Sequence, residues 1–554
     1  MCLILFRICH GNPLIRTLLY QIERYRTNKT LTFIFFGGSL AALGRVQVVV
    51  MVPPIVTRSL FRITLSSSAV AMLLSGCASM APESQAPEIA AGVPQQYSKT
   101  DANGAYEPAQ WWTSFQDPVL NALLDEALAE NLDLAEAAAR LRAAEAQARV
   151  SKSGLFPQIN ADLGSSYSDT PTAGTGFGAG GGGSRFQVES YTSGLGFSYE
   201  VDLWGRLRDD ARAARADAVA AAADLQAARL AVMAETITSY FDIVDARDQI
   251  ALTTKIIDVL GDRVEQTENR YRRGLASSFE LYQVRQDFRN IQAGLPQRES
   301  QLTATEGQLA VLVGRYSGNM DEFLAKKLSP QLIFTSIPSG LPINLLAQRP
   351  DIYAEGQRLE ARRFNLGARK AERFPSISLS AGTGTQAGSP SGLLDIFDKW
   401  VFNLGANLTA PLFQGGRIRA NIDVADAQYS QQAAVYARTV LTAYQEVGAA
   451  IERYEEERQR YRFLFSQLDE ATAAAELQSR RFATGVGSYV DYLDALRAQY
   501  QVQSALSSAA RDVALARLAV HRALGGGWNE KVPTIPAVDG ENSVVSTSET
   551  EGDK

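Results

Sequence analysis

The chain has 554 residues, of which 46% are hydrophobic and 21% charged, and it carries a net charge of −6 at pH 7. This balance excludes a wholly disordered chain and a bundle of many membrane-spanning helices, and the acidic excess argues against nucleic acid as a partner. Two histidines are too few for a histidine-based metal or catalytic cluster, and three cysteines, the last of them Cys77, exclude a disulfide framework. We therefore expect neither an enzyme nor a metal site.

Residues 51–76 are predicted to be a lipoprotein signal peptide. Arg58 and Arg62 form its charged region, residues 63–74 form a short apolar core, and small residues follow. An apolar core this short does not span a bilayer stably. The letters LSGC, which end at Cys77, resemble the lipobox of bacterial lipoproteins. The resemblance implies cleavage before Cys77, a diacylglycerol on its sulfur and an acyl chain on the new amino terminus.

The residue after this cysteine is Ala78, and by the same resemblance an alanine here favours the outer membrane over retention in the inner one. A buried free cysteine is the alternative. Residues 1–50 are interpreted as an extension from a start codon placed too far upstream, with Met51 as the true first residue. A genuine N-terminal membrane segment, built on the apolar run 31–43, is the alternative there. Residues 77–109 are expected to form a lipid-anchored linker.

The body of the chain is predicted to be a tandem repeat, with a first copy at 110–330 and a second copy at 331–528. The stretch that begins at Asn131 parallels the stretch that begins at Arg349, at an offset of 218 residues. Further along the offset becomes 211, because the first copy carries a longer glycine-rich loop at 172–184. Matched glycines hold this second offset: Gly205 with Gly416, Gly274 with Gly485, and Gly314 with Gly525. One offset kept over so long a stretch indicates a duplicated unit.

Each copy is predicted to contain a helix that ends at Phe-Pro, two alternating segments and a long helical hairpin. The alternating segments span about 157–202 and 375–412, and the hairpins span about 205–313 and 416–524. A period of two with about ten residues per strand is typical of a transmembrane β-barrel with a lipid-facing outside and an aqueous inside. A soluble sandwich alternates in the same way, but four strands make a poor sandwich. We expect one share of a barrel that several subunits close, since open edges do not persist in lipid.

The helices of these hairpins are predicted to be unusually long. Residues 205–274 would extend for roughly 100 Å as a continuous helix. Within this range, residues 208–272 contain no proline and a single glycine, Gly261. Alanines recur on one side, which lets neighbouring helices approach closely as in a coiled coil. A solitary cytoplasmic coiled coil shows the same periodicity, but the attached strands and the lipid anchor argue against it.

Four stretches resemble the TolC-like outer membrane factors, in particular their lipoprotein branch, the NodT family. They are QWWTSFQDPVLNALLDEAL, RPDI with FPSISLSAG further on, APLFQGGRIRA and HRALGGGW, and the resemblance covers about residues 110–528 in collinear order. It implies an α+β membrane fold, in which the three protomers of a homotrimer each give four strands to one 12-stranded outer-membrane β-barrel. A long periplasmic α-helical barrel continues it. The lipid on Cys77 would tether each protomer beside the barrel.

The function that this resemblance implies is the outer-membrane channel of a tripartite efflux system. Such a channel is a passive conduit that meets a periplasmic adaptor protein and an inner-membrane RND pump and exports small molecules such as drugs. The sequence contains no nucleotide-binding loop of the GxxxxGK-S/T kind, so a partner must supply the energy. Two alternatives stay open: the channel of a type I protein secretion system, and a non-porous lipid-anchored periplasmic scaffold.

Two glycine turns are predicted where the long hairpins reverse, in RRGLASS and in ATGVGSY. A glycine at such a place is a helix C-cap. The resemblance implies in addition that these turns are the periplasmic tips that contact the adaptor. The tip residues are Gly274, Leu275, Ala276 and Ser277 in the first turn and Gly485, Val486, Gly487 and Ser488 in the second.

The stretch YVDYLDA follows the second turn and places Asp491 and Asp494 on one helical face. In a threefold assembly each aspartate becomes part of a ring of carboxylates, which attracts cations. The resemblance implies that these aspartates line the closed periplasmic entrance, as the VDxLDA segment of TolC-like proteins does. A solvated helix face is the alternative. Gly487 stands where some relatives carry an arginine that ties the gate shut, so the strength of closure stays open.

The remaining features have plainer interpretations. Trp111 and Trp112 are interpreted as a packed anchor rather than a binding cleft, and His521 as a residue with a helix-surface or packing role. Residues 529–554 are polar and acidic and are expected to form a disordered tail. A cation-selective lumen is predicted from three acidic residues in and beside the expected strands: Asp162, Glu200 and Asp202.

Overall fold

The computed structural model describes residues 79–83, 111–171, 185–319, 349–394 and 400–526. The chain divides into two units, Met1–Gly76 and Cys77–Lys554, and every described residue belongs to the second. The signal peptide, the acylated cysteine, the glycine-rich loop and the acidic tail lie outside the described residues, so these stay predictions. In the described part, no helix combines the length and the apolar character that a membrane span requires.

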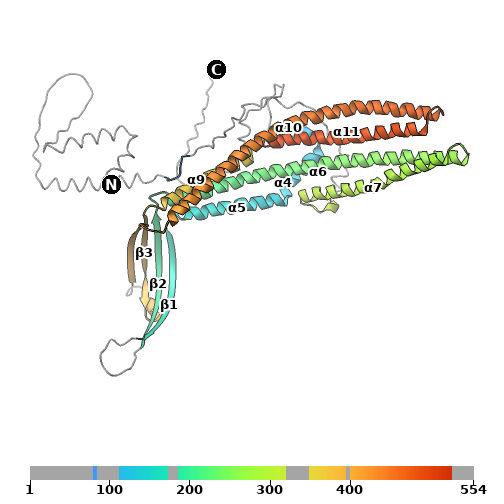
Figure 1. Ribbon diagram of the computed structural model, residues 1–554. Coiled ribbons are helices and arrows are strands. Elements are labelled where there is room, and N and C mark those ends of the chain that lie inside the picture. The colour runs from blue at the N-terminus through green and yellow to red at the C-terminus, as the bar shows by residue number, and fades with distance from the viewer. Residues whose placement is uncertain (1–78, 84–110, 172–184, 320–348, 395–399, 527–554) are drawn as a thin grey trace, which may run out of the picture. The chain divides into compact units, whose positions relative to one another are not determined.

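Long helices and a single antiparallel sheet make up the described part of this unit (Figure 1). In chain order the elements are η2 (Trp111–Phe115), α4 (Pro118–Glu130), α5 (Leu132–Ser153), β1 (Gln158–Pro171), β2 (Arg185–Val201), α6 (Arg206–Arg272), α7 (Ser278–Leu312), η3 (Ser317–Asn319), α9 (Pro350–Ala371), β3 (Ser376–Ala387), η5 (Pro390–Leu394), β4 (Trp400–Thr409), α10 (Arg417–Ala483) and α11 (Tyr489–Ala523).

The main helices come in pairs of equal length. α6 and α10 have 67 residues each, α7 and α11 have 35 each, and α5 and α9 have 22 each. At about 1.5 Å per residue, α6 and α10 each extend for roughly 100 Å. Gly205 and Gly416 precede them with φ of 75° and 86°, a left-handed conformation that glycine adopts without strain. The hairpins α6–α7 and α10–α11 therefore have the same dimensions.

The four strands form one antiparallel sheet in the order β1–β2–β3–β4. β2 and β3 pair from Tyr191 opposite Ala387 to Val201 opposite Ile377, although the whole first hairpin separates them in the sequence. β1 and β2 have 14 and 17 residues and are longer than the ten or so that the alternation indicated. β1 and β4 each pair on one side only, so the described residues leave two open sheet edges.

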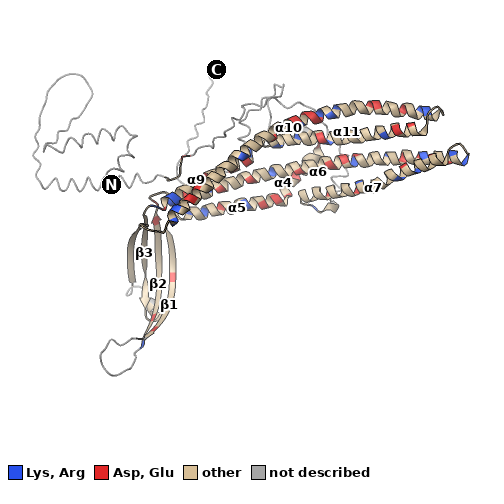
Figure 2. Ribbon diagram, in the orientation of Figure 1, with Lys and Arg blue, Asp and Glu red and all other residues tan. Residues whose placement is uncertain are grey.

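The pairing register separates the side chains of the sheet into an apolar face and a polar face. Two neighbouring rows illustrate this: Ile159, Phe197, Ala381 and Leu404 on one face, and Asn160, Gly196, Gly382 and Asn403 on the other. Of the first row, Ile159 and Leu404 are exposed in the single chain, and Phe197 and Ala381 are half-buried. Charged side chains are rare on the strands and frequent on the helices (Figure 2). The sheet thus presents an uncovered apolar surface.

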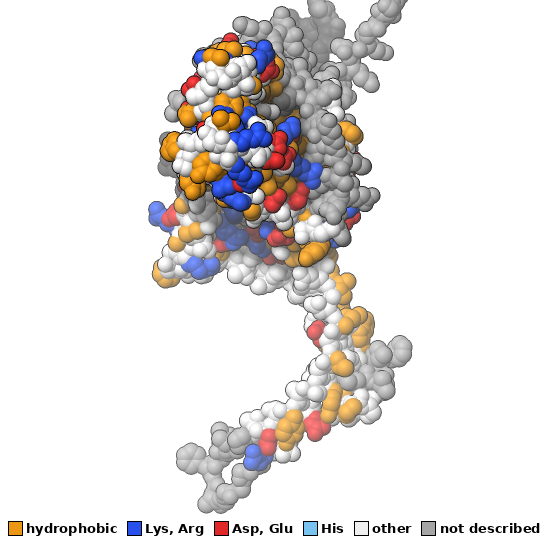
Figure 3. All heavy atoms as spheres, turned by 90° about the vertical axis from the view of Figure 1, so that its right-hand side faces the viewer, with side chains coloured by type: hydrophobic (Ala, Val, Ile, Leu, Met, Phe, Trp, Pro, Cys, Tyr) orange, Lys and Arg blue, Asp and Glu red, His pale blue; other side chains and the backbone are white. Residues whose placement is uncertain are grey.

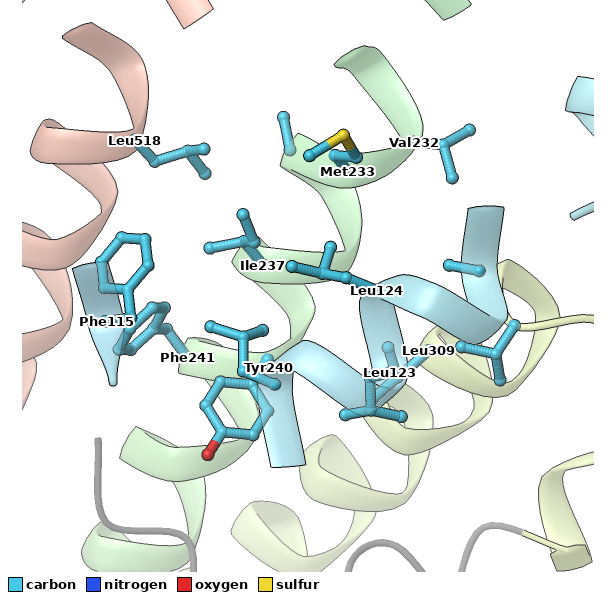
Figure 4. Close-up of a cluster of buried hydrophobic side chains, with 14 of the residues drawn as sticks. Phe115, Leu123, Leu124, Val232, Met233, Ile237, Tyr240, Phe241, Leu309 and Leu518 are labelled. Atoms are coloured by element: carbon cyan, nitrogen blue, oxygen red, sulfur yellow. The ribbon is translucent and has the colours of Figure 1, made fainter. Parts of the chain in front are cut away.

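The largest hydrophobic cluster lies where η2 and α4 pack on α6, α7 and α11 (Figure 4). Leu123 is fully buried there, and Phe115 packs on Phe241 with the ring centroids 5.2 Å apart. Truncating a buried leucine to alanine in such a cluster costs about 2–5 kcal/mol. The Tyr240 hydroxyl donates to the carboxylate of Asp117, which also caps the start of α4. This core joins both hairpins to η2 and α4.

Trp111 is a packed anchor beside this core. Its side chain is buried, and its Nε1 donates to the carbonyl of Gly526 at 3.1 Å. Its ring stacks on His521 with the centroids 4.8 Å apart. The packing roles predicted for Trp111 and His521 are confirmed. Burial lowers the pKa of His521 to about 3, and the nearby charge of Arg517 adds to this effect.

This buried imidazole makes the stability of the fold sensitive to mild acid. Because the pKa of His521 falls from 6.5 to about 3 on folding, the unfolded chain binds a proton below pH 6.5 that the folded chain does not. Lowering the pH from 7 to 5 should therefore reduce the free energy of unfolding of the wild type by about 2 kcal/mol per chain more than that of His521→Gln. Thermal unfolding of both proteins at the two pH values measures this difference. An equal loss in both would contradict the buried neutral imidazole.

Candidate functional site at the hairpin tips

The two hairpin tips are built alike. The glycine after each long helix has a positive φ, 76° at Gly274 and 78° at Gly485, and the next residue donates its N–H back to the last turn of that helix. A serine then caps the following helix: Ser277 and Ser488 each accept a backbone N–H of the first turn at 3.1 Å. The glycines therefore act as C-caps, as the sequence indicates.

Each tip also exposes an apolar side chain at the matching position. Leu275 is 66% exposed and Val486 is 73% exposed, and Phe279 is exposed beside the first of them. Seen end-on, the tips present hydrophobic, basic and acidic side chains side by side (Figure 3). A Cβ at Gly487 would lie 3.0 Å from the Cβ of Arg481, so a larger residue there requires the turn to shift. Capping alone does not account for the exposed apolar residues.

The structure places Asp491 and Asp494 in the first turns of α11, directly after the second tip. Both side chains are exposed. The N–H of Asp491 is the one that Ser488 caps, and the dipole of α11 favours a carboxylate in this turn. Asp494 is not isolated, because one of its oxygens lies 3.6 Å from Nη1 of Arg497. The two aspartates are thus accessible charges at the same end of one helix.

Arg497 connects the two hairpins, which the sequence analysis did not predict. Its guanidinium group contacts Asp494 on its own helix and donates a hydrogen bond to Asp287 on α7. The second oxygen of Asp287 is buried and accepts no hydrogen bond from the described part of the chain. The sequence allows the contact between Asp494 and Arg497 to be inferred, because these residues are three positions apart on one helix. The partner on α7 lies too far away in the sequence to be inferred.

A second arginine also joins the two hairpins, and this one belongs to the first hairpin. The guanidinium group of Arg263 on α6 lies over the rings of Phe482 and Tyr492, 4.9 Å and 4.7 Å from their centroids. Such cation–π contacts contribute about 0.5–2 kcal/mol. Burial raises the pKa of the neighbouring Tyr489 hydroxyl, and the negative charge of Asp287 adds to this effect. Near the tips, these contacts accompany a second hydrophobic cluster, to which buried residues of both hairpins contribute.

A cavity of about 350 Å³ lies between α6, α7 and α11 just beyond these contacts. Apolar side chains, among them Leu252, Ile256 and Tyr500, line its wall, and Asp287 and Arg497 also face it. In this stretch the two hairpins are less tightly packed than in the core around α4. The arginine contacts at the tips are consequently separated from the main core by a gap.

Beyond the cavity, a buried polar network joins α6 and α11 again. The carboxylate of Asp245 accepts hydrogen bonds from the Ser507 hydroxyl at 2.8 Å and from Nη1 of Arg511 at 3.4 Å. Gln249 donates to the carbonyl of Ser504 at 2.9 Å. Breaking a buried network of this kind leaves polar groups without partners and is costly. Buried hydrogen bonds thus hold the two hairpins together in this region.

The three predicted lumen carboxylates lie in different surroundings. Asp162 lies on the polar face of β1, in the row that contains Gly194 and Gly384. Both oxygens of Glu200 accept hydrogen bonds from Arg206 at 2.8 Å. Oδ2 of Asp202 accepts hydrogen bonds from Nε of Arg208 at 3.3 Å and from the Arg208 backbone N–H at 2.9 Å. Two of the three charges are therefore offset by arginines of α6. No group of metal-ligating side chains occurs within the described ranges.

Comparison with known proteins gives a consistent result. The family model described as outer membrane efflux protein matches residues 123–315 and 341–526. The probable outer membrane lipoprotein SilC of Salmonella typhimurium is 28% identical over 481 residues, which cover 85% of this chain and 100% of the relative. The antibiotic efflux pump outer membrane protein ArpC of Pseudomonas putida is 31% identical over 480 residues, which cover 84% of this chain and 96% of the relative.

Solved structures show the same similarity in three dimensions. The CmeC outer membrane channel of Campylobacter jejuni aligns with a TM-score of 0.75 and 25% identity, over 82% of this chain and 97% of that one. The outer-membrane channel OprN aligns with a TM-score of 0.71 and 28% identity, over 81% of this chain and 98% of that one.

The contacts of Arg497 can be tested by hydrogen exchange. Arg497→Ala removes the bridge from Asp494 to Asp287 and leaves the buried carboxylate without its counter-charge. We expect backbone amides of 489–500 to exchange about tenfold faster, equivalent to ~1.4 kcal/mol of local stability. Arg480→Ala is the matched control, since Arg480 pairs only with Glu476 on its own helix and both are exposed. Equal exchange in the two variants would show that Arg497 does not hold the hairpins together.

Proposed function

Since this chain belongs to the outer membrane efflux protein family, we propose that it is the outer-membrane channel of a tripartite efflux system. It lies in the outer membrane, extends into the periplasm and lets small molecules pass to the exterior. The observation that carries this conclusion is the match to efflux channels over nearly the whole described chain, in sequence and in fold. In this role the chain is a passive conduit, and an inner-membrane RND pump working through a periplasmic adaptor supplies the energy.

The names of the relatives favour efflux over the alternatives. They include an antibiotic efflux pump protein, the cation efflux system protein CusC and the pyoverdine export protein OpmQ. Cargoes this different on one fold indicate that the pump, not the conduit, selects the substrate. A type I protein secretion channel and a non-porous scaffold have no such support among these names.

A homotrimer accounts for the incomplete sheet. One chain leaves the outer edges of β1 and β4 open and an apolar face uncovered. Three chains with four strands each would close these edges in a 12-stranded barrel whose apolar face meets lipid. Equal hairpins in each chain support an internal tandem repeat, because three chains then supply six near-equivalent hairpins for the periplasmic tube. The two segments matched by the family model support the same division.

The junction between helices and sheet supports this arrangement at the level of side chains. Within the chain, Trp204 just before α6 stacks on Phe374 just before β3, with ring centroids 4.6 Å apart. The aromatic residues at the other two junctions between helices and strands are exposed instead. Phe413, before α10, is 88% exposed, and Phe156, before β1, is 57% exposed. In the trimer, β4 of one protomer meets β1 of the next, so Phe413 would pack on Phe156 of the neighbouring copy.

The tips and the aspartates take the roles that the resemblance implies. The exposed Leu275 and Val486 would make apolar contacts with the periplasmic adaptor. Asp491 and Asp494 would form two rings of carboxylates at the periplasmic entrance of the trimer, each helped by the start of α11. Acyl chains on Cys77, a diacylglycerol and an N-acyl group, would anchor each protomer in the outer membrane. The closed state would be held by the contacts of Arg263 and Arg497 and by the hydrophobic cluster beside them, and opening would require all of these to separate.

The trimer interface is tested by disulfide cross-linking. In Phe156→Cys/Phe413→Cys we expect disulfides between neighbouring protomers, seen as covalent dimers and trimers on non-reducing gels. Trp204→Cys/Phe374→Cys is the control, since these residues meet within one chain and their disulfide leaves a monomer band. A monomer band from the first pair as well would contradict the proposed closure of the barrel.

Channel activity is tested by single-channel conductance of the mature protein in planar bilayers. The wild type should give a low, cation-selective current, and Asp491→Ala/Asp494→Ala should raise the conductance several-fold, because the carboxylate rings that narrow the entrance are gone. A pore whose conductance does not change would keep the channel and contradict the gate. Absence of current from both forms, with insertion verified, would contradict the channel and favour the scaffold.

A further inference from the structure

A short chain segment that begins at Ser79 lies against the start of α6 and the second half of α9. The Ser79 hydroxyl is 2.8 Å from both carboxylate oxygens of Asp209 and donates its hydrogen bond to them. The Ser79 oxygen accepts the N–H of Ala81 at 3.1 Å, and Nη1 of Arg363 donates to the carbonyl of Pro82 at 2.8 Å. Two side chains of the helices thus hold both the hydroxyl and the backbone of this segment.

The position that receives the segment is shaped for it. Asp209, in the first turn of α6, is 0% exposed, and its burial raises the pKa of its carboxyl group while the Ser79 hydroxyl opposes that rise. Gly367 on α9 provides the space: an added Cβ would lie 2.5 Å from the Asp209 carboxylate and 2.6 Å from the nitrogen of Ala81. A buried carboxylate needs hydrogen-bond donors. Here Ser79 supplies one, and Arg212 supplies a longer contact at 3.5 Å.

Asp209 lies in the first copy of the repeat and Arg363 and Gly367 lie in the second, and this combination does not recur at the equivalent positions. The equivalent positions, at offsets of 211 and 218 residues, carry Ala420 in place of Asp209, Glu145 in place of Arg363 and Arg149 in place of Gly367. The equivalent set of residues therefore lacks the carboxylate, reverses the charge that holds the backbone and fills the space that glycine leaves open. General helix packing would not require all three differences.

We infer that Asp209, Arg363 and Gly367 form a receptor for the peptide segment that follows the lipid anchor, and that this receptor fixes where the anchor attaches to each protomer. The role for the anchor rests on the proposed acylation of Cys77. Only two residues of chain, at most about 7 Å, lead from Ser79 back to Cys77. Since α6 begins directly after β2, the receptor holds the attachment point beside the end of the sheet. Anchoring is then part of the folded structure, with one site per protomer.

The inference is tested with engineered cysteines in the full-length, membrane-inserted protein. Ser79→Cys/Asp209→Cys replaces two side chains whose oxygen atoms are 2.8 Å apart, so a disulfide should form in most molecules. Ser79→Cys/Ala420→Cys places the second cysteine at the equivalent position of the other half and should give little or no disulfide. Mass spectrometry of non-reduced peptides measures both. Absence of the first disulfide, or equal yields from the two pairs, would overturn the inference.

A second pair of variants leaves Asp209 in place, in case its loss impairs folding. Gly367→Ala introduces the clashing Cβ, whereas Gly356→Ala on the same helix makes only an ordinary 3.5 Å contact with Tyr436. We expect the amide of Ala81 to exchange at least tenfold faster in Gly367→Ala and at the wild-type rate in Gly356→Ala. Equal rates in both would overturn the inference.

The mass of the N-terminal fragment distinguishes failure of the receptor from failure of the anchor. Acylated Cys77 without the Ser79–Asp209 disulfide would overturn the receptor and leave the lipoprotein assignment intact. The disulfide without acylation would support the binding of the segment and overturn its role in positioning a lipid.

Discussion

The rest of the structure depends on the requirement that backbone hydrogen-bonding groups be paired inside a membrane. One chain supplies four strands with an apolar face, and the outer edges of β1 and β4 are left open. In lipid such a sheet is stable only when other copies complete both edges. The sheet also determines where the helices start, because α6 and α10 follow β2 and β4 in the chain. In the proposed trimer, closing the strands into a ring therefore also arranges the hairpins in a ring, and a periplasmic tube follows from barrel closure.

Along their length, the two hairpins are joined by different kinds of interaction. Around α4 the hairpins share a hydrophobic core, and the Asp245 network then joins α6 and α11 through buried hydrogen bonds. Separating these would expose apolar surface and leave polar groups unpaired, and both are costly. At the tips the hairpins share a smaller hydrophobic cluster together with the contacts of Arg263 and Arg497, and water can solvate the arginine groups when those contacts are lost. In the proposed channel, the cavity between the two regions would let the tips separate while the core around α4 stays packed.

Much of the fold could be predicted from the sequence because the duplication is regular. α6 and α10 begin directly after Gly205 and Gly416, the glycines that the offset had matched. Local rules were less reliable elsewhere: Pro296 lies inside α7, where proline normally ends or kinks a helix. The contacts that matter for the sites were not predictable in this way. Arg497 meets Asp287 across 210 residues and Ser79 meets Asp209 across 130, and no periodicity or motif signals a pairing over such distances.

In the proposed trimer, six similar hairpins form one tube, and the two halves of each chain nevertheless make different contacts. The helices keep equal lengths, since a mismatch would leave some tips short of the end of the tube. Differences therefore collect in side chains at the junctions and tips. Trp204 and Phe374 stack on each other within the chain, whereas Phe413 and Phe156 are exposed. In the same way, Ala420 in the second half stands at the position that corresponds to Asp209 in the first. The start of α6 and the neighbouring part of α9 can then bind the N-terminal segment of their own chain, while Phe413 and Phe156 contact neighbouring copies in the proposed trimer.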